Sequence, residues 1–285
     1  MRDLGIVQLA SWGDTFISTC LPRAVREQAP GCSVTFYVSS ACASAVTNNP
    51  DIDELVVLPA TKAEAFAMWD DVYRQAKGRH KVVVQPWAGK RPVSEWKLIK
   101  SRERRNFIWS ASRCIQELGL KFKGPAQNYI YPTAEEQQRV RELLTRLGPM
   151  PKVLMEFEAF SKQTQLTVDW LPKILRTIEK RIGQVQFLLS AGNIPGDLLK
   201  CNNVIPLNDY TLREVALLPD YCKAFFGVSS GTSNACHNQL RTKRIKWFEA
   251  VNHTDWDSRP YGEADKYVYL GKTLDGYLDL ISTHL

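Results

Sequence analysis

The stretch 224–240, AFFGVSSGTSNACHNQL, decides the fold expected for this chain. The apolar run Ala224–Phe226 predicts a short buried strand, and Gly227 with a cluster of small polar residues follows before a helical pattern resumes. Small residues let another molecule approach the main chain, and Ser, Thr and Asn commonly begin helices. The N–H groups at such a helix start favour an anion, above all a phosphate. The same pattern also fits an ordinary strand-to-helix turn with a good N-cap.

Short apolar runs alternate with helical patterns along the rest of the chain, which is typical of an α/β protein with parallel sheets. Strands are expected at 5–10, 33–39, 54–58, 81–85, 129–131, 152–157, 185–190, 203–205, 223–226, 244–248 and 267–269. A Gly/Pro cluster at 148–151 interrupts the alternation, so we expect two domains, 1–148 and 149–285. Ligands of such folds bind at the carboxyl ends of the strands, which places the expected site in a cleft between two facing domains.

Composition restricts the partners and the compartment. The 285 residues are 44% hydrophobic, which is enough for packed cores, and the formal net charge of +7 favours anionic partners. Seven cysteines without a Cys-x-x-Cys pair indicate reduced thiols and no structural zinc. The first residues are too short and polar for a signal peptide, and no run of 18 apolar residues occurs, so a soluble, cytoplasmic protein is expected.

Four stretches carry a resemblance to a known family. They are the turn Ser11-Trp12-Gly13-Asp14 before a helix that contains Pro22, the run 49–55 before the third strand, the segment 207–218, and the turn 226–240. In this order they resemble glycosyltransferase family 9, the lipopolysaccharide heptosyltransferases. The resemblance implies the GT-B fold of two facing Rossmann-like domains, with an N-terminal domain for the acceptor and a C-terminal domain for a nucleotide sugar.

The resemblance also implies a reaction and a base. The reaction is transfer of a sugar from a nucleotide-diphosphate sugar to a hydroxyl of an anionic acceptor, such as the lipopolysaccharide core, by inverting displacement. Asp14 matches the family's base. Its position at a helix start equally fits a capping residue, and the helix N-terminus should lower its pKa. No Asp-x-Asp motif stands in a plausible place, so neither a metal nor a cofactor beyond the donor substrate is expected.

Two further groups of residues complete the expected site. Donor contacts are expected from Lys162, Gly192, Asn193, Ser230, Gly231, Thr232 and Ser233. Acceptor contacts are expected from Ser11 and Gly13 and from the Trp- and Arg-rich segment, through Lys97, Lys100, Arg104 and Arg105. At the donor turn the family's Asp and His are replaced by Ser229 and Asn234, which leaves the phosphate-binding part of the motif.

Two other functions fit the same sequence. The positive charge and the Trp/Arg segment would suit a glycosyltransferase that modifies a hydroxylated base in DNA, with binding that weakens in salt. The altered donor turn would suit a non-catalytic ligand- or nucleic-acid-binding protein on the same fold. For any of these functions, at most peripheral contact with a membrane is expected. A Rossmann dehydrogenase is disfavoured because no Gly-x-Gly-x-x-Gly follows a strand.

Overall fold

The structure is a computed structural model that describes residues 3–86, 114, 117–121, 128–157, 166–228, 230–250, 266–269, 271 and 273–285. It contains two compact units, and the chain passes from unit 1 to unit 2 between Tyr131 and Pro132. The expected boundary at 148/149 is therefore displaced, because the helix Ala134–Leu147 buries its apolar side chains, among them Val140 and Leu143, in the core of unit 2.

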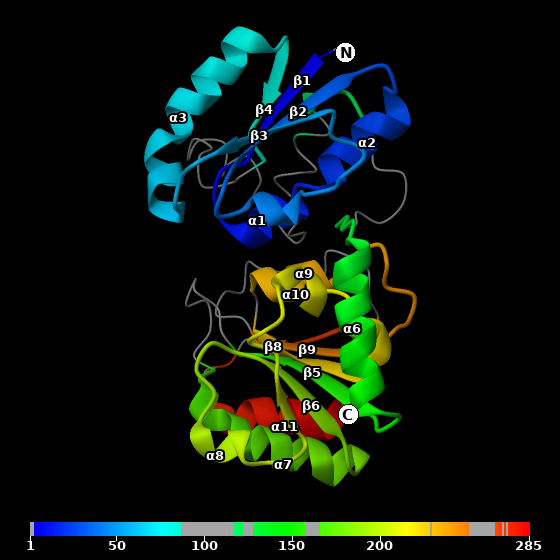
Figure 1. Ribbon diagram of the computed structural model, residues 1–285. Helices are drawn as coiled ribbons and strands as arrows, with labels where there is room; N and C mark the ends of the chain where they lie inside the picture. The colour runs from blue at the N-terminus through cyan, green and yellow to red at the C-terminus, as the bar shows by residue number, and fades with distance from the viewer. Residues whose placement is uncertain are drawn as a thin grey trace. The chain divides into compact units, whose positions relative to one another are not determined.

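Unit 1 is an all-parallel sheet between helices. Its strands lie in the order β3-β2-β1-β4 within the described residues, and Figure 1 shows α2 and α3 against the sheet. Helix α2 packs on one face and helix α3 on the other. The elements are β1 (Asp3–Val7), α1 (Trp12–Ile17), α2 (Cys20–Gln28), β2 (Ser33–Ser39), η1 (Ala43–Ala45), β3 (Glu54–Leu58), α3 (Lys62–Arg79) and β4 (Val82–Val84).

The helix with Pro22 that was expected after the Ser11–Asp14 turn is two helices, α1 and α2, and local side chains explain the break. The Ser18 hydroxyl donates to the Asp14 carbonyl at 2.7 Å, and the Thr19 hydroxyl donates to the Phe16 carbonyl at 2.6 Å. Such bonds compete with the helical ladder. Pro22 has no N–H and is tolerated only in the first turn of the new helix, α2. Residues Tyr129–Tyr131, expected as a strand, form none.

In the described part of unit 2, six parallel strands form one sheet in the order β10-β9-β8-β5-β6-β7. One face carries α7 and α11 and the other carries α6, α9 and α10, as Figure 1 shows. The elements are α6 (Ala134–Leu147), β5 (Lys152–Glu156), η4 (Val168–Trp170), α7 (Leu171–Ile182), β6 (Gln186–Ser190), α8 (Gly196–Leu199), β7 (Val204–Pro206), α9 (Leu212–Val215), η5 (Pro219–Tyr221), β8 (Ala224–Val228), α10 (Gly231–Cys236), β9 (Lys246–Ala250), β10 (Lys266–Tyr269) and α11 (Leu274–His284).

The expected α/β class with parallel sheets is thus confirmed in each unit, and helices cover both faces of each sheet. None of the helices described here is long and apolar enough to cross a bilayer.

Candidate functional site

The turn after β1 in unit 1 has a strained backbone. Ser11, the residue before α1, has φ 67° and ψ 99°, in a region that residues other than glycine seldom occupy. Its carbonyl accepts from the N–H of Thr15 at 2.9 Å and from the Thr15 hydroxyl at 3.2 Å, which fixes the start of the helix. Such strain costs about 1–3 kcal/mol and is found most often at binding and catalytic sites.

Asp14 lies in the first turn of α1, where it is half-buried. Burial is the strongest influence on its pKa and raises it to about 6, against the opposing effects of a hydrogen bond with Ser11 and of the positive charge of Lys62. The expected lowering of this pKa is wrong, because desolvation outweighs the helix N-terminus. A carboxylate with a pKa near 6 is ionised at neutral pH and accepts protons more readily than an ordinary aspartate.

Sequence reasoning missed two neighbours of Asp14. Lys62 is the first residue of α3, and its charge reaches both Asp14 and the buried thiol of Cys42. Burial raises the pKa of Cys42, which keeps it a thiol. The signal for Lys62 was its place at a helix start directly after a strand. Gly13 lies half-buried in the same turn, whereas Lys97, Lys100, Arg104 and Arg105 lie outside the described residues.

In unit 2, the turn after β8 is closed by a reciprocal capping box. The Ser230 hydroxyl accepts from the N–H of Ser233 at 3.0 Å, and the Ser233 hydroxyl accepts from the N–H of Ser230 at 3.0 Å. Both hydroxyls are therefore committed within the turn. The first N–H groups of a helix have no partner inside it, and the described residues show no acceptor for those of Gly231 and Thr232. These two main-chain groups are the ones that could hold an anion.

Two other expected donor residues lie at the carboxyl edge of the same sheet, next to the buried carboxyl group of Glu156. Glu156 ends β5, is 2% exposed, and pairs in register with Ser190 of β6 and Gly227 of β8. Gly192 and Asn193 follow β6 and are exposed. The expected donor residues that the structure describes therefore follow two strands of one sheet edge, while Lys162 lies outside the described residues. No group of three or more His, Cys, Asp or Glu in the described part could hold a metal ion.

Gly227 is required by the close approach of β8 and β5. A Cβ atom there would lie 2.4 Å from the carbonyl oxygen of Glu156 and 3.1 Å from the ring of Phe225. We therefore expect Gly227→Ala to lower the free energy of unfolding by about 1–3 kcal/mol, the usual cost of overpacking. Gly196→Ala is the matched control, because its Cβ would meet nothing within 4 Å. Urea titration measures both, and equal stability of the two variants would contradict the steric argument.

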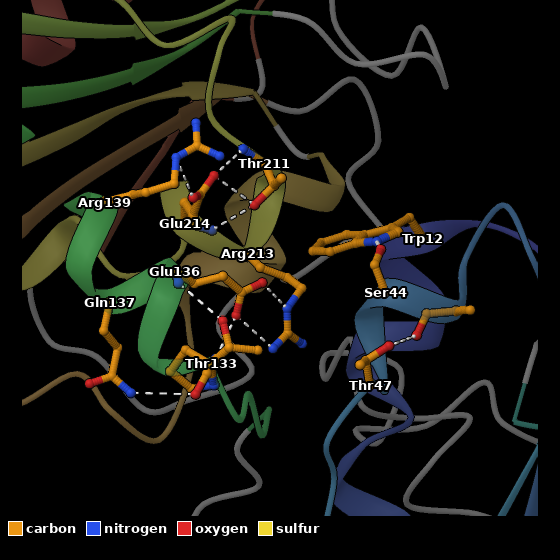
Figure 2. A network of polar contacts seen from close by, with 12 residues as sticks. Trp12, Ser44, Thr47, Thr133, Glu136, Gln137, Arg139, Thr211, Arg213 and Glu214 are labelled. Atoms are coloured by element: carbon orange, nitrogen blue, oxygen red, sulfur yellow. Dashed lines mark hydrogen bonds and ion pairs between the residues drawn. The ribbon is translucent and has the colours of Figure 1, made fainter.

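The helix starts of α6 and α9 are joined by two crossed ion pairs (Figure 2). Arg213 binds Glu136 through two hydrogen bonds of 2.6 and 3.0 Å, and Arg139 lies 3.3 Å from Glu214. Each glutamate also closes the capping box of its own helix, with Thr133 and with Thr211. The network explains why α6 belongs to unit 2.

Two Rossmann-like units with all-parallel sheets define the GT-B fold, and solved structures agree. A family 9 glycosyl transferase from Veillonella parvula is similar over 99% of this chain and 89% of its own, with a TM-score of 0.70 and 16% identity. The structure of Escherichia coli heptosyltransferase WaaC with ADP is similar over 99% of this chain and 100% of its own, with a TM-score of 0.62 and 13% identity. Escherichia coli ADP-heptose lipopolysaccharide heptosyltransferase II is similar over 99% of this chain and 98% of its own, with a TM-score of 0.58 and 12% identity. At these identities the likeness establishes the fold.

No model of a protein family matches the sequence, and no curated protein matches it either. The expected GT-B fold, and the resemblance to family 9 at the level of fold, are confirmed.

Proposed function

We propose that this protein is a glycosyltransferase that uses a nucleotide-diphosphate sugar. The observation that carries the proposal is that the structural likeness to family 9 and heptosyltransferase structures extends over both units, 99% of the chain. One of these structures was solved with ADP. The main-chain N–H groups of Gly231 and Thr232 in unit 2 are suited to a diphosphate, and the Asp14 carboxylate in unit 1 is suited to a base.

The proposed reaction is a direct displacement. The acceptor oxygen forms a bond to the anomeric carbon while the bond from that carbon to the diphosphate breaks, which inverts the configuration. The acceptor proton passes to Asp14, and the electron pair leaves with the nucleoside diphosphate. The raised pKa of Asp14 supports a catalytic role over simple capping. A capping carboxylate only accepts hydrogen bonds from the main chain, and desolvation does not help it to do so, whereas a base benefits from a raised pKa. A metal is not part of the proposed mechanism.

The acceptor in this proposal is an anionic glycan, such as a lipopolysaccharide core. We also propose that the protein acts in the cytoplasm. The chain's net charge of +7 supports an anionic acceptor. A DNA acceptor would require duplex binding that weakens steeply with salt.

A thermal-shift screen of ADP-, UDP-, GDP- and CMP-linked sugars tests the donor site. A ligand that binds only the folded protein stabilises it by about 2.7 kcal/mol at a hundredfold excess over Kd. One nucleotide class is expected to raise the Tm equally with Mg²⁺ and with a chelator. Absence of a shift with every donor would contradict the proposal and favour a binding protein for another ligand.

Gly231→Pro tests the main-chain contacts within the same screen. Proline is tolerated at the first helical position, and the extended backbone of Ser230 (ψ 173°) suits a following proline. The variant lacks one N–H, so we expect a loss of roughly tenfold or more in nucleotide affinity. Thr232→Val, which keeps both N–H groups, is the control and should bind nearly as wild type. Equal affinity of Gly231→Pro and Thr232→Val would place the diphosphate elsewhere.

A further inference from the structure

The amino edge of the unit 2 sheet carries a surface that the proposed reaction does not use. Because β5, β8 and β9 are parallel neighbours, the residues that precede them lie at one edge, opposite the Gly227–Ser233 turn. The segment before β9 is tied to η5, since the Asp220 carboxylate accepts from the N–H groups of Thr242 and Lys243 at 2.9 and 3.2 Å. The segment before β8 is tied to β5 by the N–H of Lys223 and the carbonyl of Lys152 at 2.8 Å.

This edge displays apolar side chains among cations. The amino-edge patch consists of Met150, Tyr221, Lys223, Leu240, Lys243 and Arg244. The fractional exposures of Met150, Tyr221 and Leu240 are 39%, 53% and 42%, which places them among the few large hydrophobic residues that the described surface leaves in water. The three cations are exposed. The carboxylate of η5, that of Asp220, accepts hydrogen bonds from the main chain of the segment before β9.

We propose that the amino-edge patch docks on an anionic lipid bilayer. Basic side chains near an anionic membrane each contribute favourably, and exposed apolar side chains add binding by entering the interface. A nucleic acid could use the cations and the ring of Tyr221, but it would gain little from the aliphatic side chains of Met150 and Leu240. The combination of aliphatic tips and cations on a fixed edge therefore fits a lipid surface. This proposal does not depend on the reaction proposed above.

Co-sedimentation of the intact protein with vesicles tests the patch. Wild type is expected to bind vesicles that contain phosphatidylglycerol and to bind pure phosphatidylcholine far more weakly. Lys243→Ala with Arg244→Ala should lower the partition coefficient roughly thirtyfold, about fivefold for each cation. Tyr221→Ser with Leu240→Ser should lower it roughly tenfold or more, because apolar area no longer enters the interface. Thermal melting of each variant shows that it is folded.

Lys173→Ala with Arg176→Ala is the matched control, since it removes two exposed cations from α7 in the same unit. It should leave binding close to wild type. An equal loss in this control would overturn the proposal, because binding would then follow net charge alone. Wild-type indifference to phosphatidylglycerol would also overturn it. The proposal would also be overturned if Lys243→Ala with Arg244→Ala bound vesicles like wild type but lost binding to DNA or RNA. That result would identify a nucleic-acid surface.

Discussion

Asp14→Asn is expected to reduce kcat for sugar transfer by about 10²–10⁴-fold while leaving the Kd for the nucleotide donor unchanged. Asparagine keeps the size of the side chain but cannot accept the proton of the acceptor hydroxyl. The donor contacts proposed here lie in unit 2, on the turn that contains Gly231 and Thr232. Transfer assays and nucleotide titration of the same preparation therefore separate the two effects.

The raised pKa of Asp14 gives this variant a second signature. Wild-type activity should rise with pH through about 6, because only the ionised carboxylate accepts a proton. Stability changes in the opposite direction: the folded state binds the proton more tightly than the unfolded chain, so stability present below pH 4 is lost as the pH rises through 6. The neutral amide avoids this loss. Asp14→Asn should therefore unfold less readily than wild type at pH 8, by up to about 3 kcal/mol, and equally near pH 4.

Asp70→Asn provides the same chemical change on the exposed face of α3. It should leave both activity and stability near wild type. If Asp14→Asn kept full activity, Asp14 would be a capping residue only. If it lost both activity and stability at pH 8, the burial of an ionised carboxylate would be contradicted.

The fold was open to prediction because its signals are local. Alternating and apolar runs bounded by turn residues gave β2 at Ser33–Ser39 and β3 at Glu54–Leu58 with their bounds. The boundary between the units could not be predicted in the same way. The Gly148–Pro151 cluster ends a helix but does not indicate which sheet that helix packs against. The apolar face of α6 contains Val140 and Leu143, and their partners in unit 2 come from segments far along the chain.

The site shows the same division. Hydroxyl residues before a helical pattern predicted the turns at Ser11 and Ser230. The direction of the pKa shift of Asp14 depends on how much protein surrounds its carboxyl group, which no local pattern records. The pairing of Arg213 with Glu136 joins residues 77 positions apart, so only the folded chain reveals it.

Arg213→Met is expected to lower the free energy of unfolding by about 3–5 kcal/mol, the cost of leaving one partner of a buried ion pair without the other. The Arg213 side chain is 5% exposed and that of Glu136 is 17% exposed. Burial by itself would raise the pKa of Glu136, but the hydrogen bonds and charge of Arg213, together with Thr133, hold it below the ordinary value. Glu136 thus stabilises the folded state above its unfolded pKa near 4.5, and the difference between variant and wild type should shrink as the pH falls below that value.

A second substitution shows whether the lost charge is the cause. Glutamine at position 136 still closes the capping box with Thr133 but carries no charge that needs a cation. Arg213→Met combined with Glu136→Gln should therefore recover a large part of the stability, in urea titrations of the intact chain. Arg146→Met, an exposed cation near the end of the same helix, should change it by less than about 0.5 kcal/mol. If the double variant were no more stable than Arg213→Met, the packing of the arginine stem, and not its charge, would hold the two helix starts together.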